Sequence, residues 1–403
     1  ASDVYKRQKK NYVDFGPVNT VVSSNFIDKV RFRASAQTTA NLSPHLFLKG
    51  YAAYGVRDKK WKYEGEVEYS FLKKQYSPEE FPRNSIAIST RYDVMAPSDA
   101  MLPTDKDNVF TSLKTQTIDQ MSYFRQYNIR YVYEFDNHFG ITAQLRHITQ
   151  NPTGTLFYRT LGGQIVPELT QSEATLSLRY APGEKVVVTK QRRHPVNHNY
   201  PIYTLMHTTG FKDVLGGDYA SNYTELSVTK RFWLNSYGRI DIYGRAGAQW
   251  NRVPFPLLIT PAANNSYIIQ RSMFNMINNM EFMNDRFVSL DVQWDLSGKL
   301  FNRIPLLKHL KWREVIGFKT LYGTLTDKNN PFKQGNQSDL FEFPSRNGQP
   351  TSFVMGDTPY MELNVGIHNI FKILRVDYVR RLNYLNAPNA KKNGVRFVLQ
   401  FDF

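Results

Sequence analysis

The sequence predicts an all-β protein, a transmembrane antiparallel β-barrel of about 16 strands, with about 14 as the alternative. Three observations predict this fold. Apolar and polar residues alternate along many segments, the connections between these segments are in turn short and long, and tryptophans fall at segment ends. No apolar run approaches the roughly 20 residues that a spanning helix needs, so strands are the elements expected to cross a bilayer.

The alternation is clearest in WKYEGEVEYSF, residues 61–71, where the odd positions are aromatic, Gly or Val and the even positions are Lys, Glu or Ser. Inside a soluble β-sandwich these glutamates would lie in a dry core, at a cost of several kcal/mol each unless they were paired. In a barrel the polar face lines a wet lumen and the apolar face meets lipid. The predicted lumen-lining residues are Arg31, Arg33, Glu64, Glu66, Glu68, Arg130, Glu134, Asp241, Arg245, Asp291, Asp295 and Arg396. Whether they tune conductance or close the barrel as a salt-bridged network is left open by the sequence.

The predicted strands follow one another along the whole chain. In order, they lie near residues 12–24, 29–39, 44–57, 60–72, 84–95, 122–136, 139–150, 169–181, 200–209, 219–234, 237–250, 286–298, 311–326, 357–371, 373–386 and 393–403. The alternation is weakest between residues 184 and 209, and for this reason the lower strand number is kept as an alternative.

The connections predict which end of the barrel faces the cell exterior. Long connections (96–121, 151–168, 210–218, 251–285, 327–356 and 387–392) fall on one side, and short ones (40–43, 137–138, 235–236 and 372) mostly fall on the other. Outer-membrane barrels have long extracellular loops and short periplasmic turns. Two inner connections, 182–199 and 299–310, are long for periplasmic turns, and residues 303–310 predict one amphipathic turn or short helix at the inner rim.

Aromatic residues mark the strand ends and the C-terminus. Trp61 and Trp250 fall at outer strand ends, and Trp233 and Trp312 at inner ends, where indole rings favour the membrane interface. The last segment, GVRFVLQFDF, alternates up to the final residue. We expect its apolar residues to face lipid and to be the signal that the outer-membrane barrel assembly machinery reads. The predicted signal residues are Phe397, Leu399, Phe401 and Phe403.

The net charge of +16 does not predict a nucleic-acid partner, because the basic residues are spread through strands beside acids. The excess lies in two inner connections. Residues 299–313 contain five basic residues and no acid, and residues 182–199 contain four Lys or Arg against one Glu. The preferred interpretation is a basic rim that faces lipid head groups, and the alternative is a periplasmic partner at this rim.

The chain is interpreted as one barrel, residues 11–403, after a short N-terminal segment, residues 1–10. The stretch DVYKRQ resembles an adapter-derived scar, so this segment is left out of the fold prediction, and a leader or upstream domain is expected to be missing. The chain has no Cys, which excludes disulfides and thiolate metal sites.

No catalytic, cofactor or metal site is predicted. His194 and His198 are four residues apart, but the intervening Pro195 argues against a helix that would bring them together. Asp105, Asp107 and Asn108 form half of a calcium loop and lack its Gly and distal Glu. His147 and His207 lie near outer strand ends, where barrel enzymes place such residues, but no nucleophile is paired with them in sequence. The Met- and Asn-rich stretch 272–286 has three interpretations: an ordered loop, which is preferred, an inward-folding plug, or a segment that docks a partner.

Several stretches resemble a Bacteroidota outer-membrane family of unknown function, whose barrel follows a carboxypeptidase-regulatory-like domain. The resembling residues are 23–63, 274–290, 301–315 and 362–384. The resemblance implies the fold and the location, not a reaction. The topology is also similar to surface-antigen barrels of the BamA/TamA type, in which five strands follow a long inward-folding loop. Five predicted strands follow residues 251–285 here, but this loop lacks the Arg-Gly-aromatic tip motif of those barrels.

The expected location is the cell outer membrane of a Gram-negative bacterium, with outer-membrane lipids and the assembly machinery as partners. The expected function is that of a pore, a transporter or a protein-handling scaffold without an enzymatic reaction. The first alternative is a surface-antigen-like assembly or insertion factor with a weak lateral seam. The second is an outer-membrane barrel enzyme, a lipase or protease.

Overall fold

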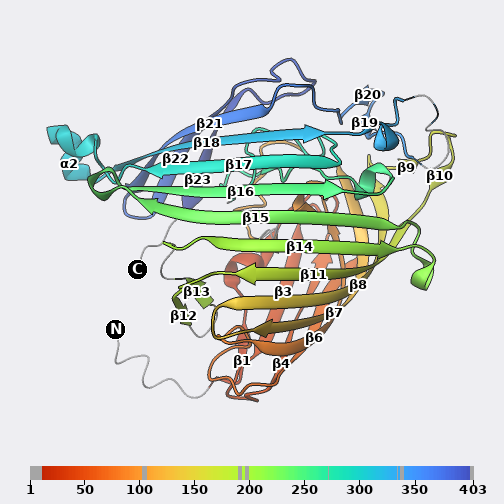
Figure 1. Ribbon diagram of the computed structural model, residues 1–403, viewed down its shortest axis with the longest axis horizontal. Helices are drawn as coiled ribbons and strands as arrows, with labels where there is room; N and C mark the ends of the chain where they lie inside the picture. Colours follow the sequence, from red (N-terminus) through yellow and green to blue (C-terminus); the bar gives the residue numbers. More distant parts are fainter. Residues whose placement is uncertain are drawn as a thin grey trace.

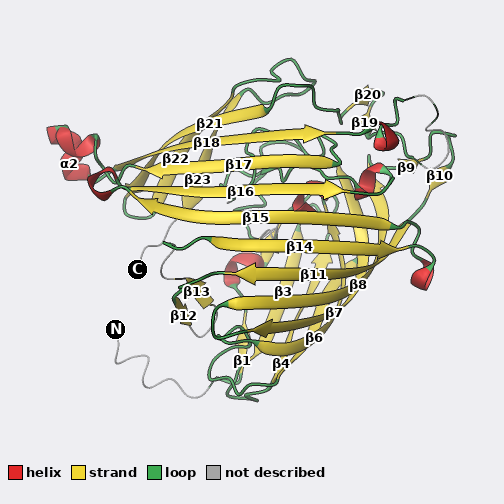
Figure 2. Cartoon of the chain, in the orientation of Figure 1, coloured by secondary structure: helices red, strands yellow, loops and turns green. Residues whose placement is uncertain are grey.

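The computed structural model shows an antiparallel sheet that curls around a central interior (Figures 1 and 2). The structure describes residues 11–101, 107–188, 193–195, 199–270, 272–333, 335 and 340–399. No helix in these ranges is long and apolar enough to cross a membrane. The sheet contains 17 strands, and each consecutive pair from β3 to β23 is antiparallel.

The strands of the main sheet follow the sequence closely. They are β1 (Val13–Phe15), β2 (Val22–Ser23), β3 (Arg31–Thr38), β4 (Leu46–Gly55), β5 (Trp61–Ser70), β6 (Asn84–Met95), β7 (Gln120–Glu134), β8 (Phe139–Gly154), β11 (Leu169–Tyr180), β14 (Ile202–Phe211), β15 (Ser221–Trp233), β16 (Arg239–Gln249), β17 (Arg286–Asp295), β18 (Arg313–Thr324), β21 (Tyr360–Ile370), β22 (Leu374–Arg381) and β23 (Asn393–Leu399).

The predicted all-β antiparallel barrel fold is confirmed, and each predicted strand region contains a strand. The first region holds two short strands instead of one. β1 and β2 both pair with β3, and the 3-10 turn η1 (Val18–Thr20) lies between them in the chain. Counted as one interrupted strand, they bring the 17 strands of the sheet to the predicted 16 positions.

Shorter elements lie at the two ends of the sheet. One end carries α2 (Pro305–Leu310) and the hairpin of β12 (Val186–Val188) and β13 (Arg193–Pro195), and the other carries the hairpins β9 (Tyr158–Arg159) with β10 (Ile165–Val166) and β19 (Ser345–Arg346) with β20 (Gln349–Pro350) (Figure 1). The remaining 3-10 turns are η2 (Pro97–Met101), η3 (Val214–Gly216), η4 (Asn235–Tyr237), η5 (Phe255–Leu257), η6 (Phe301–Arg303) and η7 (Asp327–Asn329). A short helix therefore forms within residues 303–310, where one amphipathic turn or short helix was predicted, and its place at an inner rim stays a prediction.

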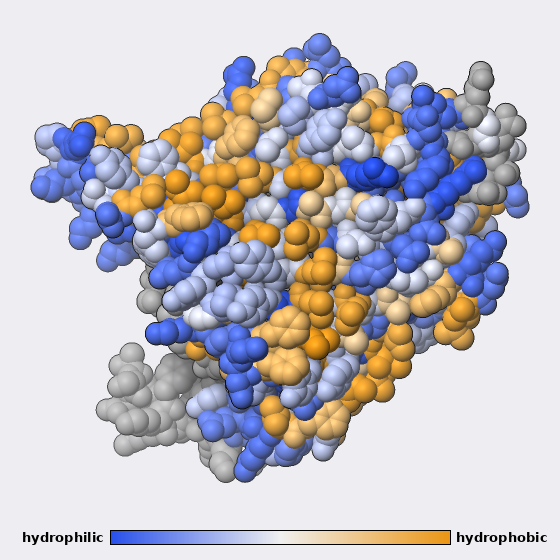
Figure 3. Space-filling model, viewed as in Figure 1, coloured by the Kyte–Doolittle hydropathy of each residue, from blue (hydrophilic) through white to orange (hydrophobic). Residues whose placement is uncertain are grey.

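The sheet has an apolar outer face and a polar inner face. On β5, Trp61 is 64% exposed and Val67 is 47% exposed, whereas Lys62 and Glu68 are buried. Hydrophobic side chains are spread over the strands in Figure 3. This arrangement is the reverse of a soluble sandwich, and it is the one that a strand needs when lipid covers one of its faces.

Candidate functional site

The interior of the sheet is occupied by the connection between β16 and β17, residues 251–285, called here the plug. It contributes most of two buried hydrophobic clusters. Its buried apolar residues are Val253, Phe255, Leu258, Ile259, Ala262, Ala263, Met273, Phe274, Met276, Ile277, Met280, Phe282 and Met283. The preferred interpretation of stretch 272–286, an ordered loop, therefore missed its inward course, and the plug alternative describes the structure.

One ion pair ties the plug to the barrel wall. Arg381 of β22 donates from Nη2 to Oε1 of Glu281 in the plug at 2.7 Å, and both side chains are at most 1% exposed. The Nη1 group of Arg381 also donates to the carbonyl oxygen of Met276 at 3.3 Å. A buried charge without a partner is strongly destabilising, so each member of this pair holds the other in place.

A second carboxylate binds the plug backbone. Glu362 of β21 accepts the backbone N–H groups of Asn275 (2.9 and 3.1 Å) and Met276 (3.0 Å), and the hydroxyl of Tyr360 donates to it at 2.9 Å. Charge-assisted bonds of this kind are about twice as strong as neutral ones. They orient one turn of the plug mainly through its backbone, and the Asn275 side-chain amide adds a longer bond to Glu362 at 3.4 Å.

Cations from two further strands complete the contact. Lys319 of β18 donates to the carbonyl oxygen of Met273 at 2.6 Å, and Arg396 of β23 donates to that of Asn275 at 2.8 Å. The plug is thus held from β18, β21, β22 and β23, all in the C-terminal part of the sheet. Of these anchors, Arg396 alone was among the predicted lumen residues. Lys319, Glu362 and Arg381 share the polar alternation of their strands, and that signal could have found them.

The predicted residues Arg31 and Arg33 belong to a second buried network. Arg31 is fully buried and pairs with Asp93 at 2.6 Å, with further contacts of 3.4 Å to Asp28 and to Asp107. Arg33 pairs with Asp107 at 2.6 Å. Lys62 also contacts Asp28, and it lies 2.5 Å from Asp58. The acidic partners come from loops and from β6, and sequence spacing does not reveal them.

The glutamates of β5 pair with arginines of nearby strands. Glu64 contacts Arg91 at 3.5 Å, and Glu66 contacts Arg130 at 3.2 Å. The third, Glu68, contacts Arg83 at 2.9 Å. Their partners are therefore on or beside β6 and β7, and Arg31 and Arg33 are not among them.

The other predicted lumen residues are paired as well. The pairs are Glu134–Arg193 (2.7 Å), Asp241–Arg231 (2.5 Å), Arg245–Glu225 (2.7 Å), Asp291–Lys319 (3.1 Å) and Asp295–His368 (3.2 Å). Asp295 also lies 3.5 Å from Arg239. The structure therefore places these charges beside partners of opposite sign, whereas Arg396 bonds to a carbonyl oxygen of the plug. Their role in lining a conducting path stays a prediction.

The two edges of the sheet do not pair with each other in the part of the chain that the structure describes. The outer edge of β23 instead bonds to the plug. The Phe397 N–H donates to the Tyr267 carbonyl, and the Ile269 N–H donates to the Phe397 carbonyl, both at 2.8 Å. Next to this contact, the Thr115 N–H donates to the Asn265 carbonyl at 2.8 Å. Residues 265–269, called here the edge segment, thus lie between β23 and the loop that precedes β7.

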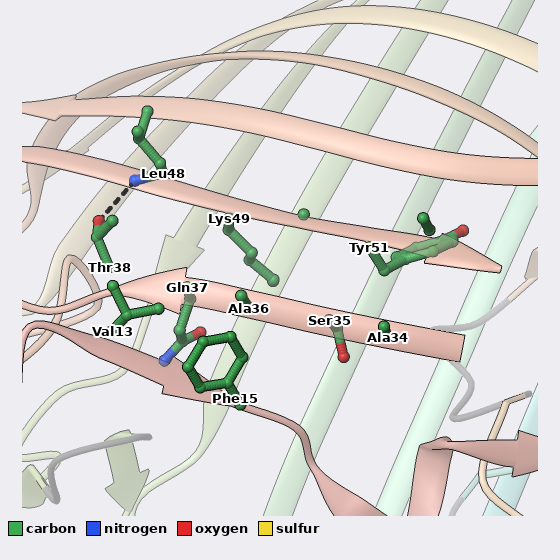
Figure 4. Close-up of a pocket in the computed structure, with 12 residues that line it drawn as sticks. Val13, Phe15, Ala34, Ser35, Ala36, Gln37, Thr38, Leu48, Lys49 and Tyr51 are labelled. Atoms are coloured by element: carbon green, nitrogen blue, oxygen red, sulfur yellow. Dashed lines mark hydrogen bonds between the residues drawn. The ribbon is translucent and has the colours of Figure 1, made fainter. Parts of the chain in front are cut away.

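The opposite edge is short and exposed. β1 pairs with β3 over three residues, and Phe15 at its end is 83% exposed. Figure 4 shows Val13 and Phe15 beside β3, at a hollow of about 410 Å³ whose floor is made of small residues: Ala34, Ala36, Gly50 and Ala52. We call the region between this edge and β23 the seam.

The predicted interface tryptophans lie at strand ends. Trp61, Trp233 and Trp250 are more than half exposed, and Trp312 is half-buried. Of the predicted insertion signal, Phe397 and Leu399 are half-buried in β23, and Phe401 and Phe403 lie outside the described residues. The interfacial and signal roles of these residues stay predictions.

The histidines are not assembled into a site in the described part of the chain. His147 contacts Ser172 at 3.0 Å, and His207 contacts Thr224 at 2.8 Å, but no carboxylate is recorded at either ring. Asp107 of the half calcium loop is bound by arginines, and Asp105 lies outside the described residues, as do His198 and the side chain of His194. No group of three or more potential ligands gathers among the described residues.

Comparison with known protein families assigns the chain to one of them. Residues 2–332 match the C-terminal domain of a family of unknown function, DUF5686. The chain belongs to this family. No curated protein matches it. The family assignment agrees with the resemblance seen in the sequence and brings no reaction with it.

Solved structures similar to this family member are outer-membrane barrel proteins. BamA from Haemophilus ducreyi, in a form lacking POTRA domains 1–3, aligns with a TM-score of 0.58 and 9% identity over 97% of this chain and 71% of that one. CdiB from Acinetobacter baumannii aligns with a TM-score of 0.47 and 10% identity over 97% and 60% of the two chains. OccK11 (OpdR) from Pseudomonas aeruginosa gives a TM-score of 0.30 and 7% identity over 91% and 87%. At these identities the BamA similarity shows the fold alone.

Proposed function

We propose that this protein is a plugged barrel of the Gram-negative outer membrane that acts as a protein-handling scaffold at its seam. The observation that carries the proposal is the pairing of β23 with the edge segment instead of with the first strand. An unpaired backbone N–H or C=O group in the hydrocarbon region costs several kcal/mol, so a strand edge there needs a partner. The edge segment supplies that partner from inside.

In this contact, a strand of another chain can take the place of the edge segment. An amphipathic strand of another chain offers the same backbone groups as the edge segment, and addition of a strand to an exposed edge is a common mode of recognition. The opposite edge favours the same partner. It is short, and exposed apolar side chains (Phe15, Val18, Val21 and Val22) follow it. The proposed client is therefore an outer-membrane β-strand that has not yet been paired.

The occluded interior argues against a standing-open pore. The anchors from β18 to β23 hold the plug in the lumen, and the wall charges are compensated. A transporter remains compatible with this arrangement if the plug moves. The seam nevertheless has the more specific feature. The edge of β23 already forms backbone hydrogen bonds with the edge segment, as it would with a strand of another chain.

Site-specific photo-crosslinking in living cells tests the proposal. A benzophenone side chain at Phe15 is expected to form adducts with outer-membrane barrel precursors. The matched control is the same group at Leu226, which is 45% exposed on β15, far along the sheet from either edge. Equal adduct yields at the two positions would show that the seam has no such role.

A disulfide lock gives an independent test, because the chain contains no native Cys. The variant Ile268→Cys with Phe397→Cys joins a bridged pair of the plug and β23. Crosslinking at position 15 should be blocked in the oxidised variant and restored by reduction, and comparing these two states removes any effect of Phe397 on assembly. The control Thr175→Cys with Thr208→Cys joins two paired wall strands and should leave crosslinking unchanged. A lock that leaves the adducts intact would contradict exchange at this edge.

We also propose that the C-terminal residues Phe397, Leu399, Phe401 and Phe403 act as the insertion signal for the assembly machinery. Deleting Phe403 is expected to reduce the amount of heat-modifiable barrel in the outer membrane severalfold. The measurement is the folded fraction on semi-native gels, with deletion of the exposed loop residue Gly335 as the control. An unchanged yield would remove the signal role.

A further inference from the structure

A cavity of about 710 Å³ lies between the plug and the wall formed by β6 to β16. Its volume falls within the roughly 300–1,000 Å³ of small-molecule sites. It is separate from the seam, and nothing in the proposed function uses it. Its wall side and its plug side differ in chemistry.

The plug side is apolar. It presents Phe255, Leu257, Leu258, Ile259 and Met280. Phe255, Leu258 and Met280 are at most 3% exposed, so they are fixed by packing against the rest of the plug. This side of the cavity offers a preformed hydrophobic surface.

The wall side carries uncharged hydrogen-bonding groups. Glutamines come from four strands, and the threonine hydroxyls come from β11 and β14. The residues are Gln126, Gln144, Gln150, Gln171, Gln249, Thr175 and Thr208. A primary amide both donates and accepts hydrogen bonds, so such a surface suits a ligand that does the same.

The charges at the cavity are neutralised by one another. Arg146 donates from Nε to Glu173 at 2.9 Å, and Arg245 donates to both oxygens of Glu225 at 2.7 and 2.9 Å. Arg91 has the carboxylates of Glu64 and Asp93, each at 3.5 Å. Asp99 lines the cavity as well, so its three arginines are balanced by three carboxylates and the lining has no net formal charge to recognise an anionic or cationic ligand.

Two buried groups on the wall, and one on the plug, have unused hydrogen-bonding capacity. Gln171 is 1% exposed, and neither its amide nitrogen nor its amide oxygen has a partner among the described residues. The amide oxygen of Gln249, which is 3% exposed, and the hydroxyl of Thr260, which is 5% exposed, are likewise unpartnered there. All three residues line the cavity. Leaving such groups unsatisfied costs about 1–3 kcal/mol each, which a hydrogen-bonding ligand would recover.

The backbone makes room for the Gln171 amide. A Cβ atom at Gly210 would lie 3.1 Å from Gln171 Oε1 and 2.2 Å from Ser221 Oγ. Glycine at this position therefore allows the amide to remain beside β14. The unpaired amide has a formed place in the wall and is not a frayed surface group.

We propose that this cavity binds a neutral saccharide of two or three sugar rings. A saccharide has hydroxyl groups that donate and accept along its edge, which matches the amide wall, and an apolar C–H face, which matches the plug. It carries no charge, as the compensated ion pairs require. The ligand would lie between two parts of the molecule, so its binding also stabilises the plugged state.

Isothermal titration calorimetry on the full chain tests this directly. The barrel is purified in an amine-oxide detergent, because detergents with sugar head groups would compete for the site. The probes are maltotriose, lactose and trehalose, with glucuronate as a charged control and tetraglycine as a neutral peptide control. Saturable binding of at least one neutral saccharide, and weaker or no binding of both controls, is the expected result.

Variants of the wall amides test whether the saccharide binds in the cavity. Gln171→Met and Gln249→Met keep the side-chain length and remove the amide, and each is expected to weaken saccharide binding at least tenfold. Gln164→Met, on an exposed loop, should leave it unchanged. If Gln171→Met does not fold, as judged by heat-modifiability, the Gln249→Met variant and the wild-type titration still decide the question.

Three results would overturn the proposal. These are an absence of saturable binding for all three saccharides, preferred binding of tetraglycine or glucuronate, and saccharide binding that is unaffected by both glutamine variants. None of these outcomes bears on the seam, since crosslinking at position 15 is measured separately.

Discussion

The wall from β18 to β23 and the wall from β5 to β16 use buried charges in different ways. In the first, Arg381, Glu362 and Lys319 point their hydrogen bonds at the plug. In the second, pairs such as Glu66–Arg130 and Arg231–Asp241 join neighbouring or nearby strands to each other. The first wall therefore holds the plug through charged side chains, whereas the charges named on the second pair with one another and a cavity lies beside it. The difference teaches that plug position and barrel stability can be changed separately.

The largest effect is expected from Arg381→Met. The change leaves Glu281, which is 1% exposed, as an uncompensated buried charge, at a cost of about 3–5 kcal/mol. Because the plug bears this cost, it should loosen and let the barrel pass ions. Planar-bilayer recording is the measurement, with a silent wild type as the reference.

The matched control is Arg159→Met, which breaks an exposed pair with Glu342 at 3.6 Å. Exposed pairs contribute about 0–1 kcal/mol, so this variant should stay silent and fully stable. Silence of both variants, together with unchanged hydrogen exchange in the plug, would contradict the assignment of Arg381 as an anchor.

A smaller effect is expected from Arg231→Met, on the other wall. Arg231 pairs with Asp241 between β15 and β16, and both side chains are partly exposed. The loss should be about 1 kcal/mol or less, seen as a small decrease in the denaturation temperature. Conductance should remain absent, because this pair does not touch the plug. Channel activity in this variant would erase the distinction between the two walls.

A local effect, confined to one end of the plug, concerns Lys391, in the loop between β22 and β23. Its Nζ donates to Thr115 at 3.0 Å and to Asn265 of the edge segment at 3.1 Å. Burial, with smaller contributions from Arg396 and Lys114 and an opposing one from Glu281, lowers the pKa of Lys391 from 10.5 to about 7. The unfolded chain keeps the proton up to its ordinary pKa, so stability rises with pH between about 7 and 10.5.

Hydrogen exchange of residues 265–269, corrected for intrinsic rates, should therefore be slower at pH 8.5 than at pH 6.5. The variant Lys391→Met should lose this difference, and Lys333→Met, on an exposed lysine, should keep it. An unchanged pH dependence in the Lys391 variant would show that another group controls the edge segment.

The strands could be predicted from the sequence because apolar and polar residues alternate within each of them. The period of two in residues 61–71 follows from having lipid on one face and polar groups on the other, and no distant residue is needed to see it. The interrupted first strand was less regular for a physical reason. β1 and β2 pair over only three and two residues, so little of that segment has two defined faces.

The site could be predicted only in part because its contacts are distant in sequence. Glu64 was correctly placed among polar residues, but its partner Arg91 depends on the register between β5 and β6. The plug was harder still. Its Met and Asn residues show no period, and its burial comes from partners about 80 to 120 residues away, such as Glu362 and Arg396.

The bonding of the edge segment to β23 has a consequence for the order of assembly. Phe397, Arg396 and Arg381 all belong to the last two strands, and their plug partners lie about 100 residues or more earlier in the chain. The plug cannot form these contacts until β22 and β23 are present. Any truncation before β22 would thus remove the contacts of Arg381 and Arg396 with the plug, while those of Lys319 and Glu362 would be kept. Formation of the last two strands of the sheet and retention of the plug are therefore coupled through contacts of large sequence separation, which are slow to form.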